Sequence, residues 1–153
     1  MKAICLACWL TLIPACVGAV APIELARGVM PQHPQQPQLA IDAKGTIHVV
    51  FGLGGQLLYY RSTDAGKSYT TSPHLPSIYG MALGMRRGPR IVATETTVCI
   101  SAIGSVDAKG KKGNLLAIRS TDGGASWLGP VRVNDTDQSA REGLHAMAIG
   151  PLG

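Results

Sequence analysis

Residues 57–69 read LLYYRSTDAGKSY, and residues 115–127 read LLAIRSTDGGASW. Eight of the 13 aligned positions are identical, and the last position is aromatic in both copies. The aspartates of the two copies, Asp64 and Asp122, lie 58 residues apart. A repeat of this length is typical of stacked supersecondary units, each about one small sheet in size. The chain is therefore expected to consist of repeated sheets, with function sought where the sheets meet.

Each copy places four residue types where a tight turn needs them. A serine hydroxyl and an aspartate carboxylate can accept main-chain N–H groups inside the turn. A glycine permits positive φ, and the closing aromatic ring can fold back between neighbouring sheets. In chain order these positions are Ser62, Asp64, Gly66 and Tyr69 in the first copy, and Ser120, Asp122, Gly124 and Trp127 in the second.

This arrangement resembles the Asp-box, S-x-D-x-G-x-[ST]-[WY], the BNR repeat of sialidase-type β-propellers, and both copies match every fixed position. The resemblance implies an all-β fold, here a partial β-propeller with two four-stranded antiparallel blades and the start of a third. It also implies a sialidase-like glycoside hydrolase acting on anionic sugars. In that family an arginine triad, a Tyr/Glu nucleophile pair and an Asp acid/base lie opposite the Asp-boxes. No catalytic role is carried over to a residue of this chain.

Composition and turn signals agree with the all-β prediction, because the chain has 19 Gly, 10 Pro and only 15% charged residues. We expect a signal peptide over 1–21, a Pro/Gln-rich linker over 22–36, blade one over 37–85, blade two over 86–140 and the start of blade three over 141–153. Strands are expected over 38–41, 46–51, 56–61 and 69–72, then over 90–93, 97–102, 115–119 and 130–133, and again from 144 onward. Propellers close with about four to eight blades, so the chain is expected to be the N-terminal part of a longer protein or a truncated product.

The first 21 residues predict export. Lys2 is followed by an uncharged apolar stretch that is too short for a confident membrane span. Three outcomes are open: cleavage near Ala21, lipid anchoring at Cys16 after a lipobox-like Ile13-Pro14-Ala15, or an uncleaved anchor. The expected location is periplasmic or extracellular, and the only expected membrane contact is the lipid anchor at Cys16.

Three arginines are the candidate substrate-binding residues. Arg87 and Arg90 precede or begin the inner strand of blade two, and Arg141 lies before the inner strand of blade three, near Glu142 and His145. Such positions line the axis of a propeller, and a guanidinium group can hold a carboxylate with two hydrogen bonds. The alternative is that these are ordinary surface charges of the loops between blades.

Several other features predict packing or solvation rather than chemistry. Cys99 lies in the apolar run Val98-Cys99-Ile100 and is expected to be a buried apolar residue. Since Cys5, Cys8 and Cys16 all lie in the signal, no disulfide framework is expected. His48 is expected to be a packing or surface residue. The basic run over 109–112 predicts a solvated loop and no nucleic-acid binding, because no aromatic residues alternate with its charges. No metal site and no cofactor is expected, and Asn134-Asp135-Thr136 is a glycosylation signal only in a cell that glycosylates.

Three classes of function are compatible with these features. The first is an exported sialidase-like hydrolase of which this chain is a part. The second is a non-catalytic Asp-box propeller that binds glycans or proteins, and the third is an inactive fragment. Fold does not fix function, so the choice depends on the residues that surround the axis.

Overall fold

The computed structural model describes residues 21–72, 74–84, 86–109 and 113–150, which form eight strands and no helix. Most of the predicted signal peptide, including Cys16, lies outside the described residues, as do most of the 109–112 basic run and the last three residues.

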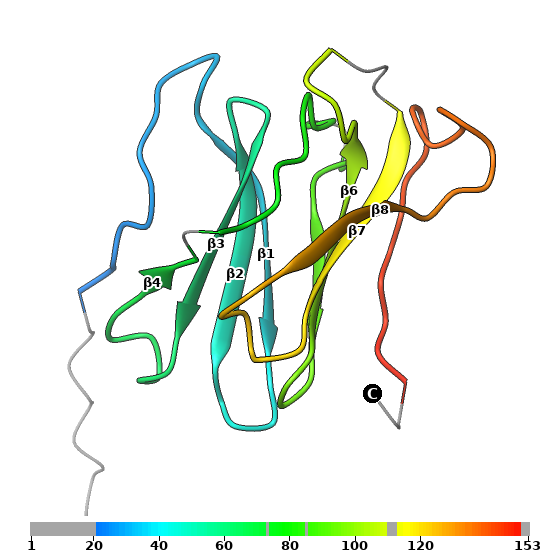
Figure 1. Ribbon diagram of the computed structural model, residues 1–153. Coiled ribbons are helices and arrows are strands. Elements are labelled where there is room, and N and C mark those ends of the chain that lie inside the picture. The colour runs from blue at the N-terminus through cyan, green and yellow to red at the C-terminus, as the bar shows by residue number, and fades with distance from the viewer. Residues whose placement is uncertain (1–20, 73, 85, 110–112, 151–153) are drawn as a thin grey trace, which may run out of the picture.

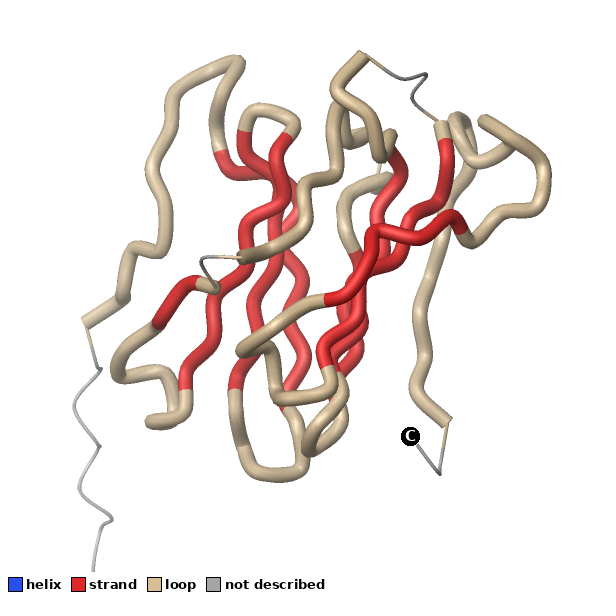
Figure 2. The backbone as a smooth tube through the Cα atoms, in the orientation of Figure 1, coloured by secondary structure: helices blue, strands red, loops and turns tan. Residues whose placement is uncertain are grey.

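The strands form two four-stranded antiparallel sheets that face each other (Figure 1, Figure 2). The first sheet, blade one, contains β1 (Pro34–Ile41), β2 (Ile47–Leu53), β3 (Gln56–Ser62) and β4 (Thr70–Thr71). The second sheet, blade two, contains β5 (Arg90–Ala93), β6 (Val98–Gly104), β7 (Asn114–Ser120) and β8 (Leu128–Arg132). Each sheet keeps the strands in chain order. The predicted all-β class with two antiparallel blades is confirmed.

The tight turns explain why the strands end where they do. Leu53 pairs with Gln56 across a two-residue loop in which Gly54 and Gly55 have φ of 58° and 81°. Positive φ at both loop residues is typical of the hairpin turn that matches strand twist, and glycine adopts it at little cost. Gly54 and Gly55 therefore form the hairpin turn between β2 and β3, and β5 has the predicted bounds.

The first strand begins earlier than predicted. β1 starts at Pro34, whereas the sequence suggested a linker to residue 36 and a strand from Gln38. A register shift between Gln35 and Gln38 interrupts the pairing, with Gln36 at φ 53°. Pro37 has no N–H group to donate to a ladder, so the strand passes it through a bulge. The high proline and glutamine content led to the prediction of a linker, whereas the strand continues on both sides of this bulge.

The inner strand expected after residue 144 is absent from the described residues. Residues 143–150 are extended but have no strand partner. They lie over the face of blade two that points away from blade one, where Met147 and Ile149 share a hollow with Cys99 and Arg119. A β-strand requires a neighbour to complete its hydrogen bonds, and the described part of the chain supplies none here.

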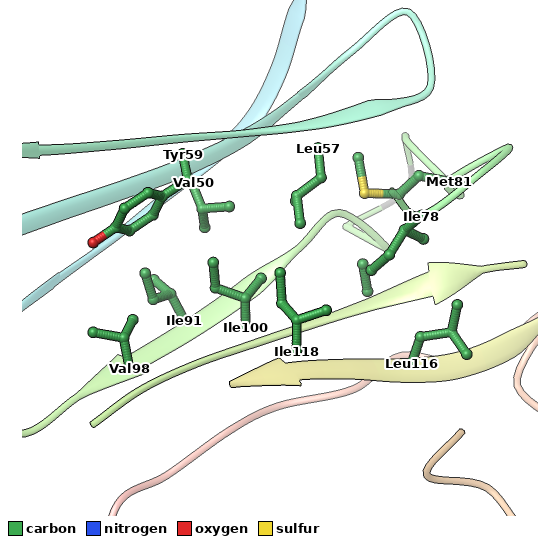
Figure 3. Packing of buried hydrophobic residues seen from close by; sticks show 11 residues of the cluster. Val50, Leu57, Tyr59, Ile78, Met81, Ile91, Val98, Ile100, Leu116 and Ile118 are labelled. Atoms are coloured by element: carbon green, nitrogen blue, oxygen red, sulfur yellow. The ribbon is translucent and has the colours of Figure 1, made fainter. Parts of the chain in front are cut away.

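The main core lies between the two blades (Figure 3). Alternate residues of blade one point toward alternate residues of blade two, because side chains of a strand alternate between faces. Figure 3 also shows Ile78 and Met81, from the β4–β5 connection, closing one end of this layer. The buried apolar residues are Val50, Leu57 and Tyr59 from blade one, Ile78 and Met81 from the connection, and Ile91, Val98, Ile100, Ala102, Leu116 and Ile118 from blade two.

Candidate functional site

Both Asp-boxes form the same hydrogen-bonded turn, between β3 and β4 and between β7 and β8. In the first, Asp64 Oδ1 accepts from the Ser62 hydroxyl at 2.7 Å and from the Ser68 amide at 2.9 Å. The Ser62 hydroxyl in turn accepts from the Gly66 amide at 2.8 Å. In the second, the Ser120 hydroxyl donates to Asp122 at 2.7 Å and accepts from the Gly124 amide at 2.7 Å.

These bonds keep both aspartates ionised. The hydroxyls of Ser68 and Ser62 and the Ser68 amide hold the pKa of Asp64 far below its usual range. The hydroxyl and amide of Ser126 have the same effect on the pKa of Asp122. A carboxylate that accepts several hydrogen bonds is a poor proton donor at neutral pH. The Asp-box aspartates therefore stabilise turns and are unsuited to general acid chemistry.

The second Asp-box also docks on blade one. The Trp127 ring meets the Tyr59 ring edge-on, with centroids 4.9 Å apart, and its Nε1 donates to the Ser72 hydroxyl at 3.1 Å. Arg61 donates to the Gly123 carbonyl at 3.1 Å. The expectation that the aromatic residue folds back between sheets holds for Trp127. Tyr69, at the same place in the first box, is half-buried and lies near Gly66 of its own turn.

At the opposite end of the blades, two of the three candidate arginines come together. Arg87 and Arg141 line a hollow of about 170 Å³ with Gly80, Ala82, Ile103, Gly104 and Gly113. The Arg87 guanidinium donates to the Arg141 carbonyl and to the Glu142 carboxylate, each at 3.1 Å. The Arg87 side chain is 21% exposed, whereas the Glu142 side chain is 81% exposed. A shielded cation is thus paired with an exposed anion.

The third candidate, Arg90, has a different position. Its guanidinium donates to the carbonyls of Arg86, Gly88 and Pro89 at 2.6, 2.8 and 3.0 Å. Arg86 has φ 65°, a conformation that side chains with a Cβ adopt at a cost. By binding the carbonyls on both sides of Arg87, Arg90 fixes the loop that presents Arg87. It does not line the hollow with the other two arginines.

His145 and Ser101 form a small polar cluster beside Arg90, on the outer face of blade two. His145 Nε2 lies 3.4 Å from the Ser101 carbonyl, and Arg90 pairs with Ser101 across β5 and β6. Burial lowers the pKa of His145, and the nearby Arg90 charge acts in the same direction. In the described part of the chain, Ser101 Oγ and His145 Nδ1 are buried without a hydrogen-bond partner. The sequence pointed to His145, but Ser101 carried no signal.

Two other residues noted in the sequence have structural roles. His48 is fully buried: its Nδ1 lies 2.7 Å from the Tyr59 hydroxyl and its Nε2 lies 3.4 Å from Asp42. Asn134 is bonded to the start of β7, because its Oδ1 accepts from the Leu115 amide and its Nδ2 donates to the Asn114 Oδ1. These bonds hold the segment after β8 against blade two.

Cys99 is only half-buried, so the prediction of a buried side chain is corrected. The structural reason is its position: it points to the outer face of blade two, where it lines an open hollow with Met147 and Ile149. Burial still raises the pKa of its thiol.

The described residues contain no group of three or more His, Cys, Asp or Glu side chains that could hold a metal ion. Within the same residues, no helix has the length and apolar character needed to cross a membrane. Comparison of the chain with protein-family models, with curated proteins and with solved structures gives no match. A functional interpretation therefore depends on the Asp-box geometry and on the two-arginine hollow.

Proposed function

We propose that this chain is part of a sialidase-like Asp-box propeller that binds acidic sugars, with Arg87 and Arg141 contacting the sugar carboxylate. The observation that carries the proposal is the hollow that both arginines line. In Figure 1 the loop entering β5 and the segment after β8 lie at the upper end of the blades, whereas the Asp-box turns lie at the lower end. This is the arrangement that the resemblance implies for a ligand site.

Binding would proceed by exchange of one carboxylate for another. Glu142 now neutralises Arg87 from an exposed position, and Arg141 Nε lies 3.6 Å from the same carboxylate. The Glu142 carboxylate is already largely in water, so a ligand carboxylate can replace it on Arg87 without leaving that cation unpaired. A sugar carboxylate would then meet two guanidinium groups, and a guanidinium–carboxylate pair can form two parallel hydrogen bonds.

The lining of the hollow favours recognition over hydrolysis as the role of this segment. Glycoside hydrolysis needs an acid group and a nucleophile on either side of the scissile bond. The residues that line the hollow are Gly, Ala, Ile and the two arginines. A non-catalytic glycan-binding propeller is therefore the second candidate, and a hydrolase would draw its nucleophile and acid from other parts of the full protein.

Calorimetric titration of the full chain with 3′-sialyllactose tests the proposal. Arg87→Ala and Arg141→Ala should each weaken binding by roughly tenfold, the effect of losing about 1.4 kcal/mol of a charge-assisted contact. Glu142→Gln should tighten binding, because the competing carboxylate is removed. Arg119→Ala, beside the second Asp-box at the other end of the blade, is the matched control and should bind as the wild type does.

Two results would contradict the proposal. The first is wild-type affinity in both Arg87→Ala and Arg141→Ala, and the second is no binding of 3′-sialyllactose by the correctly folded wild type. Turnover of a fluorogenic sialoside by the same samples separates the two candidate functions, since a binding protein releases no fluorophore.

A further inference from the structure

The extended segment over 144–150 lies on blade two without belonging to its sheet. Figure 1 shows it as the red segment that descends beside blade two, and its later residues share a hollow with β5, β6 and β7. In the described part of the chain, none of its N–H or C=O groups bonds to another main-chain group. We call this segment the strap. Since strand pairing does not hold the strap, its side chains must do so.

The side chains of the strap alternate between the sheet and solvent. His145 and Met147 are half-buried, whereas Leu144, Ala146 and Ala148 are exposed. A period of two is the geometry of an extended chain whose alternate side chains point in opposite directions. The strap is therefore attached to the outer face of blade two through His145 and Met147.

His145 provides the polar part of this attachment. In the described residues, one hydrogen bond joins the strap to the sheet, between His145 Nε2 and the Ser101 carbonyl at 3.4 Å. A carbonyl can only accept, so Nε2 carries the ring proton and Nδ1 of the neutral ring is an acceptor. Nδ1 is buried and, among the described residues, has no hydrogen-bond partner. The contact thus fits the neutral imidazole and offers no acceptor for a second ring proton.

The surroundings of His145 on the sheet also disfavour its charged form. Burial lowers the pKa of His145, the Ser101 carbonyl of β6 opposes this effect, and the Arg90 charge of β5 adds to it. The next ionisable pair on the same face is Cys99 of β6 and Arg119 of β7, which are paired in register. Burial raises the pKa of the Cys99 thiol, so this pair contributes a neutral group and a second cation.

The carboxylates near the strap already have other partners. Glu142 lies three residues before His145 in the sequence, but it is 81% exposed and pairs with Arg87 at 3.1 Å. Glu95 lines the hollow at the far end of the strap and pairs with Lys44 at 3.0 Å. Among the described residues, a protonated His145 would therefore find two arginines on the sheet beneath it and no free carboxylate.

We propose that the strap is a pH-sensitive latch, which lies on blade two while His145 is neutral and leaves the sheet when the ring gains a proton. A second ring proton would leave a buried donor without an acceptor, beside the Arg90 charge, and an unmet buried group costs more than one hydrogen bond contributes. Release puts the ring in water, where histidine binds its proton near pH 6.5. Docking is therefore favoured above pH 6.5 and weakens as pH falls below it. The latch is independent of sugar binding, because it needs neither Arg87 nor Arg141.

Amide ¹⁵N relaxation of the full chain at pH 7.5 and pH 5.0 tests the latch. Order parameters of residues 144–149 should be about 0.8 or higher at pH 7.5 and below about 0.6 at pH 5.0, the values of rigid and flexible backbone. His145→Gln should keep the strap ordered at both pH values, because its amide can donate to the Ser101 carbonyl and does not titrate. His145→Lys should leave the strap mobile at both pH values.

His74→Gln is the matched control, since it changes an exposed histidine of the β4–β5 connection, and its strap should respond to pH as in the wild type. The strands β6 and β7 should stay ordered at both pH values. Four results would overturn the latch: an ordered wild-type strap at pH 5.0, a mobile one at pH 7.5, equal loss of order in His145→Gln and the wild type, or loss of order in β6 and β7 together with the strap.

Discussion

At the residue scale, the same residue at the same motif position is subject to different steric constraints in the two Asp-boxes. Gly66 and Gly124 occupy the same Asp-box position and have φ of 85° and 88°. A Cβ at Gly66 would find its nearest neighbour at 3.5 Å, an ordinary contact. A Cβ at Gly124 would overlap the Tyr59 hydroxyl. The first glycine is therefore needed for its turn alone, and the second is needed for its turn and for the contact between blades.

Gly124→Ala should therefore destabilise the fold more than Gly66→Ala. Both substitutions carry the conformational cost of positive φ, roughly 1–2 kcal/mol. Only Gly124→Ala adds overpacking against Tyr59, which costs about 1–3 kcal/mol more. Urea unfolding of the two variants measures the difference. Equal losses of stability would show that the close approach of Tyr59 does not constrain this turn.

The Asp-box carboxylates should make stability sensitive to acid. Because their folded pKa values lie below the ordinary value of 3.8, their stabilisation is present above that value and is lost as pH falls below it. Asp64→Asn and Asp122→Asn should unfold at lower urea concentration than the wild type at pH 7, and the gap should narrow at pH 3. Binding of 3′-sialyllactose by the folded variants should not change. A specific loss of binding without loss of stability would give the aspartates a role in the ligand site.

At the element scale, the contact between blades combines an apolar layer with one buried polar chain. Asp42, His48 and Tyr59 are linked at the end of the interface near the second Asp-box, where Trp127 packs on Tyr59. Buried polar groups are tolerated when they are hydrogen-bonded, and here each has a partner. Burial also raises the pKa of Tyr59 to about 12, so its hydroxyl stays protonated.

His48 should couple the blade interface to pH. Burial lowers the pKa of His48, the Asp42 carboxylate opposes this effect, and the Arg61 charge adds to it. In the unfolded chain this histidine therefore binds its proton at about pH 6.5, whereas in the folded chain it does so only at lower pH. The free energy of unfolding consequently falls as pH drops below 6.5. The slope contributed by one proton is at most about 1.4 kcal/mol per pH unit.

Unfolding by urea between pH 7.5 and pH 5 measures this slope. His48→Gln should have a smaller pH dependence than the wild type, although its stability at pH 7.5 should be lower because the Tyr59 bond is altered. His74→Gln changes an exposed histidine in the β4–β5 connection and should keep the wild-type slope. An unchanged slope in His48→Gln would contradict the argument.

At the scale of the whole molecule, the face of blade one that points away from blade two carries apolar residues. They are the counterparts of residues that blade two buries against blade one. Leu39 of β1 pairs with Val49 of β2, and Ile91 of β5 pairs with Ile100 of β6. Val49 and Ile100 occupy equivalent positions in the two sheets, so Leu39 is the counterpart of Ile91. Leu39 is 64% exposed, whereas Ile91 is 8% exposed. Ile41, on the same face as Leu39, is 59% exposed. Contiguous exposed apolar residues on a sheet favour association.

The full chain is therefore expected to self-associate through this face. Leu39→Lys combined with Ile41→Lys should shift the chain toward monomer in size-exclusion chromatography with light scattering. Val131→Lys, an equally exposed apolar position on β8, is the control and should leave the distribution unchanged. A wild type that remains a monodisperse monomer at high concentration would overturn this expectation.

Local chemistry made much of the fold predictable. The Asp-box turns, the Gly54-Gly55 hairpin and the Arg90–Ala93 strand follow from residues close together in the sequence, so propensity and turn geometry suffice to find them. The β1 bulge and the unpaired segment over 143–150 were missed. In both cases strand formation depends on a neighbouring strand rather than on local residues.

Local residues suffice to predict two antiparallel sheets with the same serine–aspartate–glycine turn, because each turn closes its own hydrogen bonds within eight residues. The contacts between the two blades and the partners of the arginines are visible in the tertiary structure alone. Tyr59 meets Trp127, and Arg87 meets Glu142, across more than 50 residues of chain. The Arg90 guanidinium binds a carbonyl of its own loop, although the sequence suggested the same role for Arg90 as for Arg87. Contacts of this kind are set by the packing of one sheet on another, which no local pattern encodes.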